Sequence, residues 1–266
     1  MQDAELLWLA DQNLAEFCRT QSRSLPTYRL EEDDRRLLVA SGTRFPGGVI
    51  NCAFPLGDGP VDAPALVDDA ARFFAPLDRG YSIYAPTHRG PDLARVCGAA
   101  NYPQLADSPG MVLTQRIAPA EPGAGVELRF ASDARGAADF TAVCASAYET
   151  MQQPASVTQK LFSMPERWLR PNYHVLVLYE HERPVCAAVL LFSQQIAGVY
   201  WVATIAEARG RGYAAMIMRR LSNHAFDAGA RLVVLQASPF GEPIYRKLGY
   251  REFTRYPFFL VMKQKP

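Results

Sequence analysis

The stretch that decides the fold is residues 199–214, which read Val-Tyr-Trp-Val-Ala-Thr-Ile-Ala-Glu-Ala-Arg-Gly-Arg-Gly-Tyr-Ala. An apolar run ends near Ile205, a short polar bend follows, and a helical pattern opens after Arg209. The first backbone N–H groups of a helix have no partner inside the helix, and the peptide dipoles make that end positive. Because glycine lets the backbone approach a phosphate and arginine adds charge, this turn predicts an anion site.

The same turn carries the pattern Arg209-x-x-Gly212-x-Ala214. It resembles the Arg/Gln-x-x-Gly-x-Gly/Ala element with which the GNAT superfamily of acyl-CoA-dependent N-acyltransferases holds the CoA pyrophosphate. Taken alone, the stretch also fits an ordinary helix start with surface arginines. Two other glycine motifs, the Gly-x-x-x-x-Gly-Lys-Ser/Thr loop and the dinucleotide-binding Gly-x-Gly-x-x-Gly with its acidic partner, do not occur in the sequence.

Hydrophobic periodicity extends this resemblance over residues 126–266. Helices are expected at 133–148, near 156–162, at 210–228 and at 239–248, between strands at 126–130, 173–179, 185–193, 199–205, 231–237, 250–255 and 258–263. This order is similar to the GNAT fold, an α/β (α+β) architecture with a central mixed, twisted sheet and helices on both faces. A second motif supports the resemblance, because Tyr245 lies one helical turn before the pair Gly249-Tyr250.

The N-terminal half resembles a degenerate copy of the same domain in the order of its expected elements. After a helix at 3–18 and strands at 27–30, 36–40 and 45–54, we expect helix 64–75, strand 81–85, helix 91–97 and strand 111–117. Where the phosphate turn would lie, residues 56–62 read Leu-Gly-Asp-Gly-Pro-Val-Asp, and their carboxylates would repel a pyrophosphate. We therefore expect two GNAT-like domains in tandem, a degenerate one at 1–118 and a catalytic one at 126–266, joined by a linker at 119–125.

Composition favours a soluble intracellular protein. The 266 residues are 49% hydrophobic and 21% charged, which suits two packed domains and argues against disorder. No apolar run reaches the roughly 18–20 residues that a membrane helix needs, and the N-terminus lacks a signal-peptide layout, so we expect a cytoplasmic protein and no membrane partner. The five cysteines form no Cys-x-x-Cys pair and the four histidines show no ligand spacing, so we expect reduced thiols and no metal.

Charge is unevenly divided along the chain. Residues 1–125 hold 11 Arg against 16 Asp and Glu, whereas residues 126–266 hold 17 Lys and Arg against 11 Asp and Glu. A basic C-terminal half suits a polyanionic ligand. Nucleic acid is also a polyanion, but no run of Lys and Arg exceeds two residues and no basic-aromatic stripe is visible, so we expect no nucleic-acid partner.

The GNAT resemblance implies roles for particular residues. Backbone groups of the strand before the turn would pair with pantetheine, the turn would hold the pyrophosphate, and Ser238 would touch the CoA arm, cap the following helix, or do both. The cofactor-binding residues implied in this way are Val202, Ala203, Thr204, Arg209, Gly210, Arg211, Gly212, Tyr213, Ala214, Ser238 and Tyr245.

Acyl transfer to an amine requires a neutral amine, a polarised thioester carbonyl and a proton for the leaving thiolate. By the family pattern Tyr245 is the proton donor, and its alternative is a buried aromatic residue on an amphipathic helix. The sequence does not identify the general base; Glu149 is a candidate, although a solvated helix end is the better explanation of this residue. His174, Tyr200 and Glu207 are weaker candidates for the same role.

We therefore expect an N-acetyltransferase that transfers an acetyl group from acetyl-CoA to a primary amine, of a small molecule, directly within a ternary complex. Peptide N-termini and lysine side chains stay open as acceptors. Whether the protein forms a homodimer also stays open. The alternatives are a catalytically silent CoA-binding regulator, an enzyme using another acyl-CoA, and a degenerate binding module with an unrelated ligand.

Overall fold

The computed structural model describes residues 3–23, 27–43, 47–150, 157 and 160–262. It divides into two compact units: unit 1 comprises Met1–Gly110 with Glu252–Pro266, and unit 2 comprises Met111–Arg251. These bounds differ from the expected 1–118 and 126–266, because nearly all of the last strand counts with the N-terminal half and residues 111–125 count with the other. That the two halves are copies of one domain stays a prediction.

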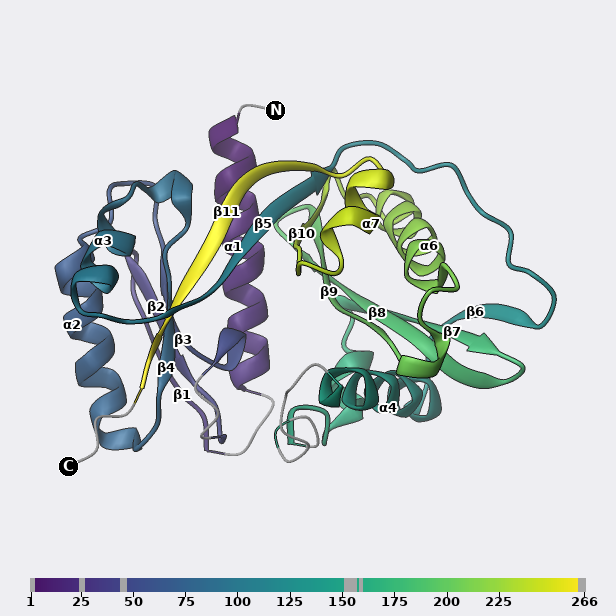
Figure 1. Cartoon of the computed structure of the whole chain (residues 1–266), viewed down its shortest axis with the longest axis horizontal. Coiled ribbons are helices and arrows are strands. Elements are labelled where there is room, and N and C mark those ends of the chain that lie inside the picture. Colours follow the sequence, from purple (N-terminus) through teal and green to yellow (C-terminus); the bar gives the residue numbers. More distant parts are fainter. Residues whose placement is uncertain (1–2, 24–26, 44–46, 151–156, 158–159, 263–266) are drawn as a thin grey trace. The chain divides into compact units, whose positions relative to one another are not determined.

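Unit 1 is a mixed sheet with helices on both faces (Figure 1). Its strands lie in the order β1-β2-β3-β4-β11-β5, with β3 and β4 parallel and the pairs β1–β2, β2–β3 and β4–β11 antiparallel. The strands are β1 (Arg29–Glu32), β2 (Arg36–Ala40), β3 (Asn51–Pro55), β4 (Tyr81–Tyr84), β5 (Gln104–Leu113) and β11 (Arg251–Val261), and the helices are α1 (Asp3–Ser22), α2 (Ala63–Phe74) and α3 (Asp92–Ala99).

Alternation along β2 explains why both faces of this sheet are covered. Leu38 and Ala40 join the apolar cluster formed with α2 and α3, whereas the neighbouring side chains of Leu37 and Val39 point to the opposite face and are equally buried. Helix α1 contacts β1, β2 and β3. Strand β2 is therefore buried on both faces, by α2 and α3 on one side and by α1 on the other.

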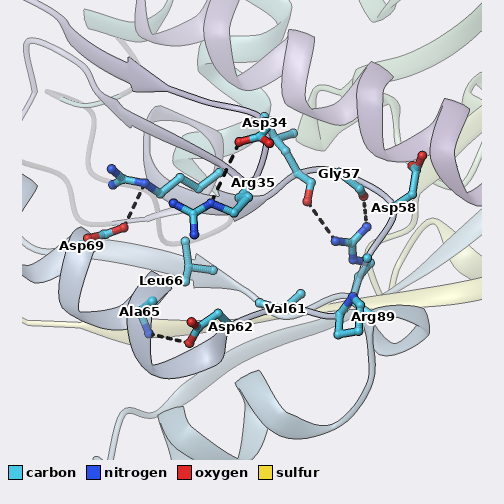
Figure 2. A pocket seen from close by; sticks show the side chains of 14 residues that line it. Asp34, Arg35, Gly57, Asp58, Val61, Asp62, Ala65, Leu66, Asp69 and Arg89 are labelled. Atoms are coloured by element: carbon cyan, nitrogen blue, oxygen red, sulfur yellow. Dashed lines mark hydrogen bonds and ion pairs between the residues drawn. The ribbon is translucent and has the colours of Figure 1, made fainter.

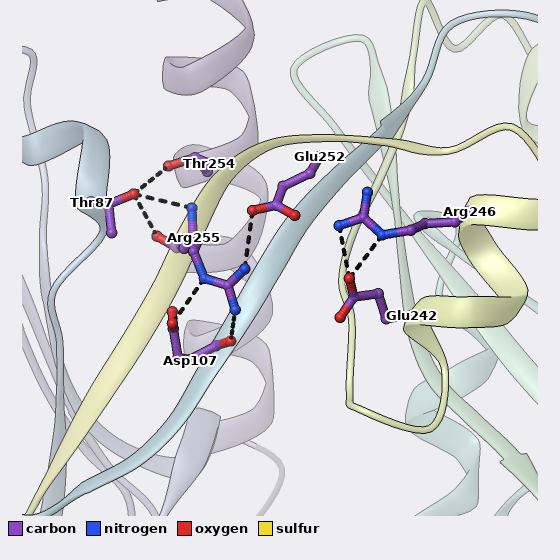
Figure 3. Close-up of polar contacts among 7 residues, drawn as sticks. All are labelled: Thr87, Asp107, Glu242, Arg246, Glu252, Thr254 and Arg255. Atoms are coloured by element: carbon purple, nitrogen blue, oxygen red, sulfur yellow. Dashed lines mark hydrogen bonds and ion pairs between the residues drawn. The ribbon is translucent and has the colours of Figure 1, made fainter.

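Strand β11 corrects the expectation of two separate strands at 250–255 and 258–263. It runs unbroken through Pro257, whose carbonyl accepts a hydrogen bond from Ala85 N at 2.9 Å. Within unit 1, Arg255 Nε also lies 2.8 Å from Asp107 Oδ2 and its Nη1 lies 3.1 Å from Glu252 Oε1 (Figure 3). Proline cannot donate to a ladder but can accept, so it interrupts neither the strand nor its pairing here.

Unit 2 is also a mixed sheet, with α4 and α6 on opposite faces of its central strands (Figure 1). Its strand order is β5-β10-β9-β8-β7-β6, with β5 represented by residues 111–113. The remaining strands are β6 (Val126–Phe130), β7 (Tyr173–Glu180), β8 (Arg183–Ser193), β9 (Ile196–Thr204) and β10 (Val233–Gln236); the helices are α4 (Ala134–Glu149), α6 (Tyr213–Asp227) and α7 (Glu242–Lys247). The helix expected near 156–162 falls partly outside the described residues.

Helix α6 lies where the periodicity predicts it. Its apolar side chains Ile217, Met218, Leu221 and Ala225 are fully buried. The helix ends before Gly229, whose φ of 90° lies in the left-handed region that glycine tolerates, and Gly229 N donates to Phe226 O at 3.1 Å. The buried stripe fixes the helix against the sheet and so fixes the position of its N-terminus.

Over the described ranges, no helix is long and apolar enough to cross a membrane. The same part of the chain contains no group of three or more His, Cys, Asp or Glu side chains arranged to hold a metal ion.

Candidate active site

A pocket of about 300 Å³ lies at the N-terminal end of α6 in unit 2. Nine of the predicted cofactor residues line it: Val202, Thr204, Arg209, Gly210, Gly212, Tyr213, Ala214, Ser238 and Tyr245. Two predicted residues do not. Ala203 is buried in the sheet, and Arg211 lies outside the lining.

The start of α6 is open to an anion. Gly210 and Gly212 have φ values of 77° and 81°, and a Cβ atom on either would meet no other atom within 4 Å. The N-cap residue, Gly212, provides no side-chain hydrogen bond to the first turn. Backbone N–H groups at this helix end therefore face a pocket that glycine keeps clear, which is the geometry that binds phosphate.

The two arginines of the turn have protein partners in this structure. Arg209 Nη2 donates to Thr150 Oγ1 at 2.6 Å, after the last turn of α4. Arg211 Nη1 lies 2.8 Å from both carboxylate oxygens of Glu180, and Tyr213 donates its hydroxyl proton to the same carboxylate. The roles of Arg209 and Arg211 as pyrophosphate ligands stay predictions.

Strands β9 and β10 pair over a short distance only. Their parallel register is Val233 with Ala197 and Val234 with Gly198, while β9 continues to Thr204. The stretch 199–204 thus extends beyond the paired region, on the side where Val202 and Thr204 line the pocket. One of its carbonyls, that of Thr204, accepts from Arg209 Nε at 3.2 Å.

A bulge interrupts β9 at the edge of this pocket. Val189 pairs with Tyr200 and Ala187 with Ala203, so Trp201 and Val202 together oppose the single residue between them on β8. Trp201 has a φ of 51°, a left-handed conformation that is unfavourable for a bulky side chain. The bulge is a local strain of the kind that clusters at functional sites.

Tyr245 and Ser238 close the pocket from the side of α7. Burial raises the pKa of Tyr245 well above its ordinary value, and the nearby Cys186 adds to the shift. The phenol therefore stays protonated at neutral pH and can donate a proton. Ser238 Oγ accepts from Gly241 N at 3.2 Å, so this residue both caps the turn into α7 and lines the pocket.

None of the candidate bases lines the pocket. Glu149 ends α4 with an exposed side chain, and the carboxylate of Glu207 lies 3.9 Å from Arg183 at the surface. Tyr200 is buried in β9, and His174 Nδ1 lies 2.7 Å from His224 Nε2 between β7 and α6. The structure brings no predicted base to Tyr245, and the role of Glu149 stays a prediction.

Four lining residues were missed from the sequence: Ala215, Phe240, Gly241 and Ile244. Phe240 is 78% exposed at the pocket rim, and such an aromatic side chain in a loop carries no periodic signal. Gly241 is explained by close approach, since a Cβ there would lie 2.7 Å from the Tyr245 ring. A glycine four residues before the predicted proton donor was the signal that could have found it.

Unit 1 contains a second pocket, of about 430 Å³, beside residues 56–62 (Figure 2). It differs from the pocket of unit 2 because polar groups in its lining already form hydrogen bonds with one another. Asp62 caps α2, accepting from Ala65 N at 3.1 Å, and Arg89 Nη2 donates to the carbonyl of Leu56 at 2.9 Å. Four aspartates and three arginines line it, so carboxylates outnumber guanidinium groups in this lining.

Residues 192–253 match the sequence model of the acetyltransferase (GNAT) domain. This segment contains the bulged strand, the start of α6 and Tyr245, the same elements that build the unit 2 pocket. The comparison therefore supports an acyltransferase, and this segment of unit 2 is similar in sequence to a GNAT domain. No curated protein matches the chain at a significant level.

Solved structures show the same fold at low identity. A GCN5-related N-acetyltransferase from Kribbella flavida is 21% identical with a TM-score of 0.71, over 94% of this chain and 96% of that one. A GCN5-related N-acetyltransferase from Sphaerobacter thermophilus is 15% identical with a TM-score of 0.66, over 88% and 82%. A tandem GNAT protein from the clavulanic acid biosynthesis pathway is 14% identical with a TM-score of 0.58, over 99% and 94%. The predicted fold class is confirmed.

Proposed function

We propose that the protein transfers the acetyl group of acetyl-CoA to the primary amine of a small molecule. The observation that carries this proposal is the uncapped start of α6, where Gly210 and Gly212 keep the backbone clear beside a pocket that ends at Tyr245. The residues present fit CoA: a helix end for the pyrophosphate, a strand segment that continues beyond its pairing with β10 for pantetheine, and a proton donor for the sulfur.

The transfer is a direct displacement within a ternary complex. The neutral amine nitrogen attacks the thioester carbon, a C–N bond forms, and the C–S bond breaks. The departing thiolate takes the proton of Tyr245, which solvent restores, and the amine nitrogen releases a proton to water. A thiolate is a weaker base than a phenolate, so proton donation by a buried tyrosine works best while the C–S bond is still breaking.

The experiment is thermal unfolding with and without acetyl-CoA, followed by an assay of CoA release with an amine panel. Ligand at 100 times its dissociation constant stabilises a folded protein by roughly 2.7 kcal/mol. A Gly212→Glu variant places a carboxylate in the cradle and should lose the rise in Tm. Gly229→Glu, at the other end of α6, is the matched control and should keep it.

Two outcomes would overturn the proposal in different ways. A rise in Tm with no CoA release from any amine indicates a CoA-binding regulator. No rise with acetyl-CoA, but a rise with a longer acyl-CoA, indicates a different acyl donor.

A further inference from the structure

The pocket of unit 1 combines buried apolar side chains with charged walls (Figure 2). Its apolar lining includes Leu56 and Leu66, which are both buried, and Val61. Gly57 has a φ of 76°, and a Cβ atom there would lie 2.8 Å from the carbonyl oxygen of Asp34, so glycine lets two turns of the lining pack together. A concave site of about 430 Å³ with apolar side chains and a few polar groups has the form of a small-molecule site.

Several charges in this lining already have partners. Arg36 Nε lies 2.9 Å from Asp69 Oδ2. Arg89 Nη2 donates to the carbonyl of Leu56 at 2.9 Å, and Arg89 Nη1 donates to the carbonyl of Gly57. These side chains hold the walls of the pocket together, so a ligand would be recognised by the charges that remain.

The remaining charges are of both signs. Asp58 has no hydrogen bond or ion pair with any residue that the structure describes. Asp62 accepts from Ala65 N with Oδ1, which leaves its Oδ2 to a ligand. The ion pair of Arg35 is with Asp34, at 4.0 Å between Nε and Oδ1, and these two side chains are 73% and 92% exposed. Because so exposed a pair contributes little, the guanidinium of Arg35 stays available.

These available groups come from different walls of the pocket. Arg35 belongs to the turn between β1 and β2, whereas Asp62 begins α2. Figure 2 shows Leu66 between the guanidinium of Arg35 and the carboxylate of Asp62. A ligand that lies over Leu66 would therefore meet a cation at one end and a carboxylate at the other. An ion of a single sign would be attracted by one wall and repelled by the other.

We propose that this pocket binds a zwitterion whose ammonium and carboxylate groups are separated by an apolar chain, as in an ω-amino acid. Arg35 binds the carboxylate, Asp62 binds the ammonium group, and the chain packs on Leu66 and Val61. An α-amino acid has adjacent charges and would reach one wall only. The proposal concerns unit 1 alone and does not rest on the proposed acetyl transfer.

The test is an amide chemical-shift titration of the protein, without acetyl-CoA, with four matched probes. 6-Aminohexanoate carries both charges at the ends of its chain, pentylamine and hexanoate each lack one of them, and norleucine is the isomer with adjacent charges. We expect 6-aminohexanoate to shift the amides of residues 56–66 saturably. It should bind there about two- to fivefold more tightly than the other probes, the range of a partly exposed ion pair.

Substitutions separate the two ends of the ligand. Arg35→Gln should weaken binding of 6-aminohexanoate and hexanoate but not of pentylamine. Asp62→Asn should weaken binding of 6-aminohexanoate and pentylamine but not of hexanoate, and asparagine preserves the cap of α2. Arg95→Gln and Asp68→Asn are the matched controls, since both positions are exposed and outside the lining, and should bind every probe like the wild type.

Three results would overturn the proposal. The first is the absence of a saturable shift at residues 56–66 with 6-aminohexanoate on the order of tens of millimolar. The second is equally tight binding of pentylamine, hexanoate or norleucine, because the site would then not require two separated charges. The third is wild-type affinity for 6-aminohexanoate in both Arg35→Gln and Asp62→Asn, because neither side chain would then bind the probe.

Discussion

His174 Nδ1 and His224 Nε2 lie 2.7 Å apart and join β7 to α6. Burial lowers the pKa of His174, and burial followed by the charges of His174 and Arg220 lowers the pKa of His224. Two imidazolium ions cannot share this contact, since each would offer only donors. The contact between the two histidines is therefore strongest when both imidazoles are uncharged. It joins the sheet to α6, the helix whose start forms the pocket.

This pair predicts an acid-sensitive contribution to stability. Because both pKa values are lower in the folded protein, the unfolded chain binds more protons, and the free energy of unfolding falls as pH drops below the ordinary histidine value of about 6.5. We expect Tm to decrease from pH 7.5 to 5.5, and to decrease less in His224→Gln. His181→Gln, on an exposed turn, should behave like the wild type; an identical pH dependence in all three proteins would contradict the prediction.

Glu180 holds the turn arginine away from the pocket. Tyr213 and then Arg211 keep the pKa of Glu180 below its ordinary value, so the residue is a carboxylate at neutral pH. If Arg211 binds the pyrophosphate as predicted, that carboxylate competes with the phosphate for it. We expect Glu180→Gln to bind acetyl-CoA about two- to fivefold more tightly, the range of a solvent-exposed ion pair, with a difference that shrinks as salt is added.

Glu182→Gln is the matched control for this charge change. Glu182 pairs with Arg129 at 2.6 Å, outside the pocket lining. Titration calorimetry should give the wild-type dissociation constant for it. Weaker binding in Glu180→Gln would mean that Glu180 orients Arg211 for the phosphate instead of competing with it.

The parts of the site that follow local rules were predictable from the sequence. The turn from Arg209 to Ala214 and the tyrosine before Gly249-Tyr250 are short motifs whose geometry depends on neighbouring residues, and both lie at the pocket. The carboxylates at 56–62 were predicted to repel phosphate. The structure shows in addition a local role for one of these carboxylates, because Asp62 caps the N-terminus of α2.

Features that depend on tertiary pairing were not predictable. Trp201 reads as one more apolar residue of a strand, because only the register with β8 reveals the bulge. Strand β11 was divided at Pro257, because nothing local shows that this position accepts from Ala85. The His174–His224 contact joins residues 50 positions apart, and neither one signals the other.

At Gly241 even the methyl group of alanine is expected to lower kcat. A Cβ atom at this position would lie 2.7 Å from Tyr245 Cε2, while its φ of −83° imposes no backbone strain on alanine. Gly241→Ala should therefore displace the ring and lower kcat on the order of tenfold to 100-fold, as misplaced catalytic groups do. Gly98→Ala, inside α3 with open space around it, should leave kcat unchanged and stabilise the protein by about 0.5–1 kcal/mol. Equal kcat values in both variants would exclude ring displacement.

Tyr245→Phe tests the proton donor against a structural tyrosine. Loss of a general acid should lower kcat by about 10²-fold or less, because a thiolate is already a tolerable leaving group, and should leave acetyl-CoA binding intact. Tyr250→Phe removes a buried hydroxyl 2.7 Å from Ser222 Oγ, so it should lower stability by about 1 kcal/mol and keep kcat. With its pKa raised, Tyr245 also predicts that wild-type kcat shows no alkaline decline up to about pH 10, where an ordinary tyrosine would ionise. An unchanged kcat in Tyr245→Phe would assign thiolate protonation to solvent and leave Tyr245 as a wall of the pocket.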